Sequence, residues 1–194
     1  NGKRVYDYNF HLENSLSSNN NAVLCHEMGH TFGAPDLYHS SNDAYPVSHW
    51  DIMATHGKTP QYMGAYLKYK YTKWINDMPS ISAPGIYTLQ PLSSPTNNCY
   101  KIPLEGTTEY LVLEYRQCNG IFETSSNNIR NGLLIYRINE QYNGNIDGIG
   151  YCGVTDEVYI FRPGETSTRQ GTVSQANLSN TYNRTEFNKT TNPH

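Results

Sequence analysis

The chain has 194 residues, a formal net charge of −3 and only 16% charged residues, which excludes the strongly basic surface typical of nucleic-acid-binding proteins. No apolar run approaches the roughly 18 residues that a membrane-crossing helix needs, so the sequence predicts no membrane span. Tyrosine is abundant, at 17 residues, and this composition is typical of a secreted, antiparallel β-rich protein. Neither an initiator Met nor an apolar leader precedes Asn1, so we expect a processed or N-terminally truncated chain.

The first predicted elements are a strand over residues 4–12 and a helix from about Asn21 to Phe32. Four apolar residues of this helix fall within one arc at about 100° per residue: Leu24, Cys25, Met28 and Phe32. We expect this arc to pack on the core, with Cys25 as a buried thiol. The chain's four cysteines could form up to two disulfides, in pairings that the sequence does not choose between.

The stretch HEMGHTFGAPD, residues 26–36, carries the strongest chemical signal. His26 and His30 are four apart, so on a helix they share one face and can bind one Zn²⁺ at about 2.0–2.1 Å. Glu27 points elsewhere and suits the general base that acts on a metal-bound water. Gly33 favours the left-handed end of a helix, after which the chain can turn back and bring Asp36 to the metal as third ligand. Three nearby histidines are alternative third ligands: His39, His49 and His56.

The polar stretch after Asp36 has no periodicity and predicts a loop that lines the cleft. Tyr38 and His56 lie in it and are candidates to stabilise the oxyanion that forms when water attacks a peptide carbonyl. Residues 60–76 predict a second helix, because Pro60 suits a first turn and apolar residues then recur at three- and four-residue spacing.

Beyond about residue 78 the dominant period is two. Five short runs predict strands of an antiparallel β-sandwich: residues 85–92, 99–104, 109–117, 132–139 and 157–163. Glu114 and Arg116 share a strand face, where we expect an exposed cross-strand network. The segment 142–150, YNGNIDGIG, predicts a plain loop, with Ca²⁺ binding through oxygen atoms as the alternative. The polar tail after Gly164 is expected to be surface-bound or disordered.

The pattern HExxHxxGxxD, followed by a turn that contains Met, resembles the metzincin metallopeptidases. The longer strings HEMGHTFGAPDLYH, HWDIMATHG, EYLVLEYRQ and NGLLIYRINE resemble the immune inhibitor A family of secreted bacterial metalloendopeptidases, over roughly residues 22–163. The resemblance implies that His26 and His30 are zinc ligands, Glu27 the catalytic base and Met53 the methionine beneath the site. Asp36 stands where most metzincins carry a third histidine, a departure from the pattern.

We therefore predict an α+β chain in three parts. Residues 1–78 would be the C-terminal part of a metzincin-like zinc metallopeptidase domain, with zinc helix, Met-turn and second helix. Residues 79–164 would form an antiparallel β-sandwich-like accessory domain, and 165–194 a polar tail. In metzincins a substrate-holding sheet precedes the zinc helix, and too few residues precede Asn21 to form it. The isolated chain is thus expected to bind zinc yet cleave poorly.

The predicted function is zinc-dependent hydrolysis of peptide bonds in extracellular proteins. His26, His30 and Asp36 would hold Zn²⁺, and Glu27 would assist attack by a zinc-bound water on protein or peptide substrates. The alternative is a non-catalytic, β-rich adhesion or carbohydrate-binding module with a vestigial metal site. Its support is the Tyr-rich β half, whose rings could stack on sugars.

Overall fold

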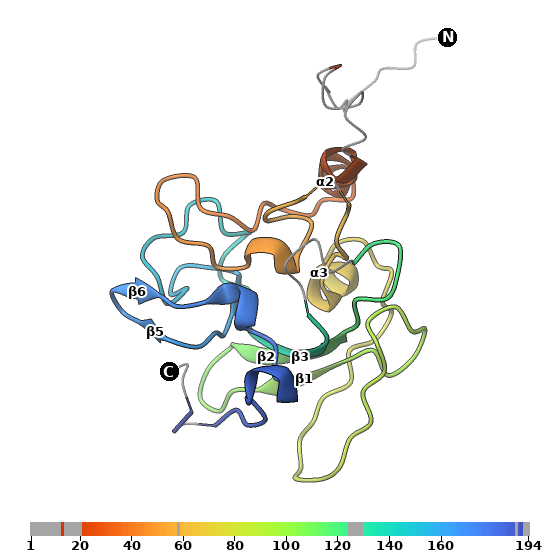
Figure 1. Ribbon diagram of the computed structural model, residues 1–194, viewed down its shortest axis with the longest axis vertical. Helices are drawn as coiled ribbons and strands as arrows, with labels where there is room; N and C mark the ends of the chain where they lie inside the picture. Colours follow the sequence, from red (N-terminus) through yellow and green to blue (C-terminus); the bar gives the residue numbers. More distant parts are fainter. Residues whose placement is uncertain (1–12, 14–20, 58, 124–129, 189, 192–194) are drawn as a thin grey trace.

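A computed structural model describes residues 13, 21–57, 59–123, 130–188 and 190–191 (Figure 1). The strand predicted over residues 4–12 lies outside these ranges. Within them, two α-helices, α2 (Asn21–Thr31) and α3 (Ala65–Lys70), stand beside two antiparallel sheets. Neither helix of the described part combines the length and the apolar character that crossing a membrane requires.

The larger sheet has four strands in the order β1-β2-β3-β4, with every neighbouring pair antiparallel. Its strands have the following bounds: β1 (Cys99–Pro103), β2 (Tyr110–Arg116), β3 (Gly132–Ile138) and β4 (Val158–Ile160). The smaller sheet pairs β5 (Glu165–Thr166) with β6 (Arg169–Gln170). Three short 3-10 helices complete the described elements: η1 (Ser48–Trp50), η3 (Val173–Gln175) and η4 (Asn180–Tyr182).

The predicted β-sandwich is wrong, because the described residues contain one four-stranded sheet with no second large sheet against it. The run 85–92 forms no strand, and its Ile86 and Tyr87 side chains are exposed. The face of the sheet that carries Val112 and Tyr136 packs instead on α3 and the loop around Trp50. Alternation along the chain predicts each strand separately, but the layer that covers a sheet depends on distant segments.

The predicted metzincin-like catalytic domain is also wrong: α2 and α3 are the only α-helices in the described residues, and α3 spans Ala65–Lys70 instead of residues 60–76. The backbone at Gly64 is extended, with ψ 161°, so the helix begins after it. The Asp51 carboxylate accepts the Gly64 amide at 2.6 Å, and Glu114 accepts that of Ala65 at 2.7 Å. These two carboxylates satisfy the free amides of the helix start. Past the other end, the positive φ of Lys73 prevents helical continuation.

One hydrophobic core joins the segments on both sides of residue 78. It includes Met53 and Leu67 from the N-terminal side and Val112 and Ile138 from the sheet. The division into a catalytic domain over 1–78 and an accessory domain over 79–164 stays a prediction. Part of the predicted tail belongs to the same core, since Ala176 is buried there and Leu178 bridges to Leu133 of β3.

Glu114 and Arg116 form a fully buried ionic cluster, so the predicted exposed network is wrong. The Arg116 guanidinium donates to Glu114 at 2.6 Å and, through two nitrogens, to the Glu123 carboxylate. The second oxygen of Glu114 accepts the Tyr136 hydroxyl at 2.8 Å as well as the amide that begins α3. The cluster is buried because α3 covers the face on which β2 places its alternate residues.

Candidate metal centre

Helix α2 ends in a turn that reverses the chain toward its own histidines. The Gly33 backbone is left-handed, with φ +89°, as the sequence predicts. The Gly33 amide donates to the His30 carbonyl at 2.8 Å, and the Ala34 amide donates to that of Gly29 at 3.1 Å. This pair of hydrogen bonds is the Schellman pattern, which satisfies two carbonyls of the last turn. The following residues return along α2 and bring Asp36 beside it.

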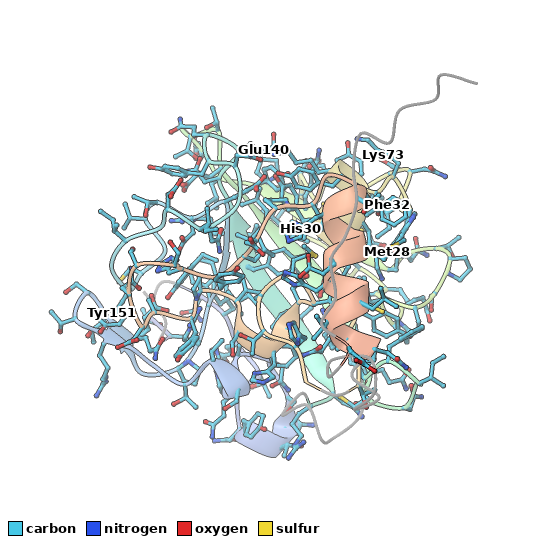
Figure 2. The ribbon with its side chains drawn as sticks, turned by 90° about the horizontal axis from the view of Figure 1, so that it is seen from above. Met28, His30, Phe32, Lys73, Glu140 and Tyr151 are labelled. Atoms are coloured by element: carbon cyan, nitrogen blue, oxygen red, sulfur yellow. The ribbon has the colours of Figure 1, made fainter. Side chains whose placement is uncertain are left out.

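The orientation of α2 is opposite to the one predicted from its apolar arc. The buried residues are Ala22, His26 and Gly29, whereas Met28 and Phe32 are 42% and 44% exposed. Figure 2 shows His30 on the side of α2 that faces the body, with Met28 and Phe32 on the opposite side. Cys25 is likewise exposed, so the predicted buried thiol is wrong, and all four cysteines are free thiols.

Gly29 gives the physical reason for this orientation. It lies between the two histidines on the buried side, and a Cβ there would collide with the Sδ of Met53. The missing side chain therefore lets the helix backbone rest on the thioether. Met53 is fully buried against Gly29, and its carbonyl accepts the Leu37 amide at 2.8 Å. Its role as the methionine beneath the metal stays a prediction.

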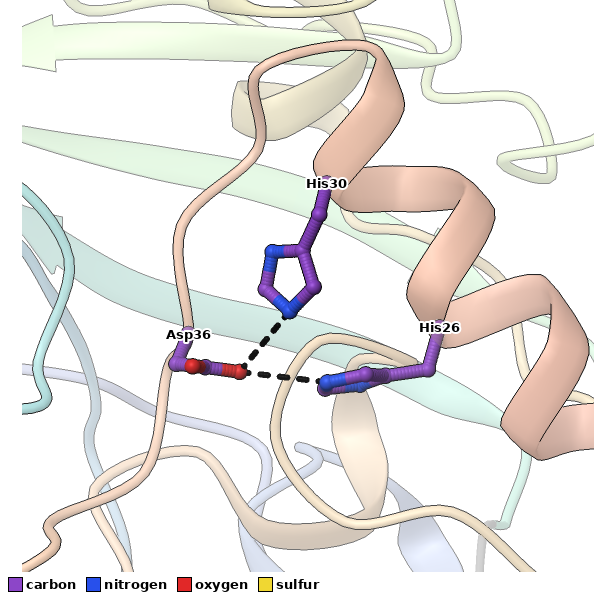
Figure 3. Close-up of side chains that lie close together, drawn as sticks. All are labelled: His26, His30 and Asp36. Carbon is purple, nitrogen blue, oxygen red and sulfur yellow. Dashed lines mark ion pairs between the residues drawn. The ribbon is translucent and has the colours of Figure 1, made fainter. Parts of the chain in front are cut away.

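Three side chains converge in the turn (Figure 3). The Nε2 atoms of His26 and His30 lie 3.1 Å and 3.4 Å from the same oxygen of Asp36, Oδ1. One ligand atom from each residue lies within 4.8 Å of the other two. Among the described residues, this is the one group of three or more His, Cys, Asp or Glu side chains arranged in this way.

The hydrogen bonds around the two imidazoles direct their lone pairs at one another. His26 Nδ1 donates to the Ile52 carbonyl and His30 Nδ1 to the Ala34 carbonyl, each at 2.8 Å. A neutral imidazole has one N–H, so each Nε2 is left as an acceptor. Asp36 Oδ1 is buried and has no hydrogen-bond partner. With both imidazoles neutral, the centre brings three acceptors together without a donor, and a metal ion or a proton on His26 satisfies them.

The pKa shifts of His26 and Asp36 arise from their contacts with each other and with neighbouring polar groups. Burial alone would lower the pKa of His26, but the Asp36 carboxylate and the Ile52 carbonyl outweigh it and raise that pKa. Burial would raise the pKa of Asp36, but the two histidines and the Tyr38 hydroxyl lower it. Each group therefore favours positive charge between the imidazoles and the carboxylate, supplied by a proton when no metal is bound.

Two of the three separations between the ligand atoms can be compared with those around a tetrahedral metal ion such as zinc. Bonds of about 2.0–2.1 Å in a tetrahedral arrangement separate neighbouring ligand atoms by about 3.3 Å. The distances from Asp36 Oδ1 to the His26 and His30 nitrogens, 3.1 and 3.4 Å, lie on either side of that value. Two imidazole nitrogens and one carboxylate oxygen are a common zinc ligand set, and three protein ligands keep a position open.

A cleft of about 420 Å³ adjoins the centre. Glu27 lines it beside His26 and takes no part in the three-residue cluster. Tyr38 and His56, the predicted oxyanion partners, line it as well, and the His56 ring centroid is 5.5 Å from that of His26. Sequence position alone could not show that both residues meet Glu27 in one cleft.

The other predicted candidates have different partners. His39 Nε2 lies 2.7 Å from the Asp156 carboxylate, and His49 Nδ1 lies 3.2 Å from the Ser48 hydroxyl. In the segment 142–150, for which calcium binding was the alternative, the Asn145 side chain donates to the Leu37 and Val158 carbonyls and accepts the Val158 amide. Calcium binding stays a prediction that no observed contact supports.

Comparison of the chain with protein-family models, with curated proteins and with solved structures found no match.

Proposed function

We propose that this chain is a zinc-dependent endopeptidase whose metal ligands are His26, His30 and Asp36. The proposal is carried by one observation, the convergence of two imidazole nitrogens and a carboxylate oxygen from His26, His30 and Asp36. Here two imidazoles and a carboxylate are held with their lone pairs facing inward.

The other residues of the cleft suit hydrolysis. A bound zinc ion would supply a Lewis acid that polarises a carbonyl and lowers the pKa of water. Glu27 lines the cleft next to His26, where its carboxylate can hold a proton taken from water and deliver it to a leaving amine. Tyr38 and His56 place a phenol and an imidazole in the same cleft, as donors for a developing oxyanion.

The motif supports a peptidase over other zinc hydrolases. HEMGHTFGAPD and the turn that contains Met53 resemble the immune inhibitor A family. We include membership of that family in the proposal, but not the metzincin fold. Extracellular proteins are the substrates that this resemblance implies. The open cleft, lined largely by uncharged side chains, is compatible with a polypeptide substrate.

Zinc content and casein cleavage test the proposal together. We expect one zinc per chain and slow cleavage that Glu27→Gln abolishes while zinc binding remains. The matched control is Glu105→Gln, since Glu105 is an exposed glutamate remote from the cleft. Stoichiometric zinc with cleavage that survives Glu27→Gln would remove Glu27 from the mechanism. A preparation without stoichiometric zinc would favour the non-catalytic adhesion or carbohydrate-binding module.

A further inference from the structure

The third ligand, unlike the two histidines, stands in a loop and needs an external support. Asp36 belongs to a segment without regular secondary structure that follows α2. We propose that Asn145, in the segment 142–150, is the positioning residue that holds Asp36 in ligand geometry. This inference rests on the proposed metal site and assigns part of its affinity to a residue more than a hundred positions away.

Asn145 contacts the backbone on both sides of the third ligand's peptide link. Its amide donates to the Asp36 carbonyl at 2.8 Å, and its side-chain amide reaches the Leu37 carbonyl at 3.3 Å. The same side chain donates to the Val158 carbonyl at 2.8 Å and accepts the Val158 amide at 3.1 Å. Asn145 is fully buried, so water does not compete for these bonds. It therefore ties Asp36 directly to strand β4.

Neighbouring contacts extend this support along two segments, residues 36–42 and 144–148, whose interface we call the seam. Gly144 is left-handed, with φ +76°, and a Cβ there would lie 2.7 Å from the Asp36 carbonyl oxygen. The Ser40 amide and hydroxyl both donate to the Ile146 carbonyl, at 3.1 and 2.9 Å. The two segments thus run side by side, and only glycine allows the approach nearest the ligand.

A buried ion pair fixes the far end of the seam. His39 and Asp156 are joined at 2.7 Å with side chains 1% and 0% exposed. The other His39 nitrogen donates to Asn42, whose side-chain amide in turn donates to the Gly148 carbonyl at 3.1 Å. A histidine with both nitrogens paired in this way serves as a structural link, which explains why His39 is not the third ligand.

The seam matters because a loop ligand otherwise loses conformational freedom when metal binds. Fixing the backbone of a residue costs conformational entropy, and the contacts with Asn145 fix Asp36 during folding, before a metal binds. On the opposite side of the segment, the Leu37 amide is held by the Met53 carbonyl at 2.8 Å. The backbone around Asp36 is therefore held by hydrogen bonds to Met53 on one side and to Asn145 on the other before any ion binds.

The test compares two buried asparagines. Asn145→Ala removes the seam's central side chain, and Asn177→Ala is the matched control. Asn177 is also fully buried and donates its side-chain amide to a backbone carbonyl, that of Asn131 at 2.8 Å, but it lies outside the metal cluster and its seam. Zn²⁺ affinity is measured by competition with a chromophoric chelator, and stability by urea unfolding. The visible spectrum of the Co²⁺ form reports the ligand geometry.

We expect both variants to lose stability, but only Asn145→Ala to weaken Zn²⁺ binding, by about tenfold, with an altered Co²⁺ spectrum. Asn145→Ser keeps a small polar group and is compared in the same way if the alanine variant does not fold. Affinity and spectrum equal to those of Asn177→Ala would overturn the inference and leave the proposed function standing. Failure of the unaltered protein to bind Zn²⁺ would overturn both.

Discussion

Two polar clusters in this molecule differ in the balance of donors and acceptors. In the ionic cluster beneath α3, the Arg116 guanidinium faces the carboxylates of Glu114 and Glu123, and donors match acceptors. In the metal centre, two imidazole nitrogens face Asp36 Oδ1, and no donor is present while both imidazoles are neutral. The matched cluster is complete by itself and serves the fold, whereas the unmatched one is complete only with a cation.

The strongest test of the matched cluster is Arg116→Ala. Its removal leaves two buried carboxylates without a counter-charge, so we expect a destabilisation of about 3–5 kcal/mol. Urea unfolding measures it, with the exposed Arg169→Ala as a control that changes stability by less than about 0.5 kcal/mol. A loss below about 1 kcal/mol for Arg116→Ala would show that the cluster does not need its cation.

The corresponding change in the metal centre is His30→Ala. Because it removes a direct ligand, we expect Zn²⁺ affinity to fall more than about 100-fold. This exceeds the loss of about 10–100-fold that follows when a residue hydrogen-bonded to a ligand is replaced. The stability of the metal-free protein should change little, since the His30 side chain is 34% exposed. His49→Ala is the control, because His49 lies outside the metal-binding group. Equal Zn²⁺ affinity in both variants would exclude His30 as a ligand.

Asp51 gives a pH-dependent test of the network around α3. Burial raises the pKa of this carboxyl to about 6, and the Met53 and Gly64 amides offset only part of the effect. The folded pKa exceeds the unfolded value, so the Asp51 contribution is complete below about pH 4 and is lost as pH rises through 6. Between pH 4 and 7, Asp51→Asn should therefore gain about 2–3 kcal/mol relative to the unaltered protein. Parallel stability curves over that range would contradict this account.

The smallest effect is expected on the outer face of α2. Met28 is 42% exposed, so Met28→Gln should change the unfolding free energy by less than about 0.5 kcal/mol and leave zinc affinity unchanged. Met53→Ala, on the buried side, should destabilise by about 2–5 kcal/mol. Urea unfolding of the pair decides which face of the helix belongs to the core. Similar losses would restore the orientation predicted from the apolar arc.

The sequence predicts the elements of this site better than their surroundings. The helix, its left-handed end at Gly33 and the meeting of Asp36 with His26 and His30 follow from local spacing. Four of the five predicted strand runs contain strands, because alternation is also local. The failures concern which segment covers which face. The apolar arc of α2 is exposed, since the buried side is decided by Met53, twenty-four positions beyond Gly29.

Long-range hydrogen bonds limit the prediction in the same way. The segment 142–150 carries no signal that it supports a metal ligand, and Glu114 carries none that it caps α3. Both roles depend on residues brought together only by the folded chain. A buried asparagine or glutamate with all its atoms used is therefore found from the structure, whereas a histidine pair at helical spacing is found from the sequence.

Zinc stoichiometry and affinity of Asp36→Ala test the central claim most directly. Asp77→Ala, which removes an exposed carboxylate outside the segments that support the site, is the matched control. We predict one zinc per chain in the unaltered protein and in the control, and an affinity more than about 100-fold lower in Asp36→Ala. If Asp36→Ala binds zinc as tightly as the unaltered protein, Asp36 is not a ligand and the account is wrong. His56, whose ring lies beside that of His26, would then be the next residue to test.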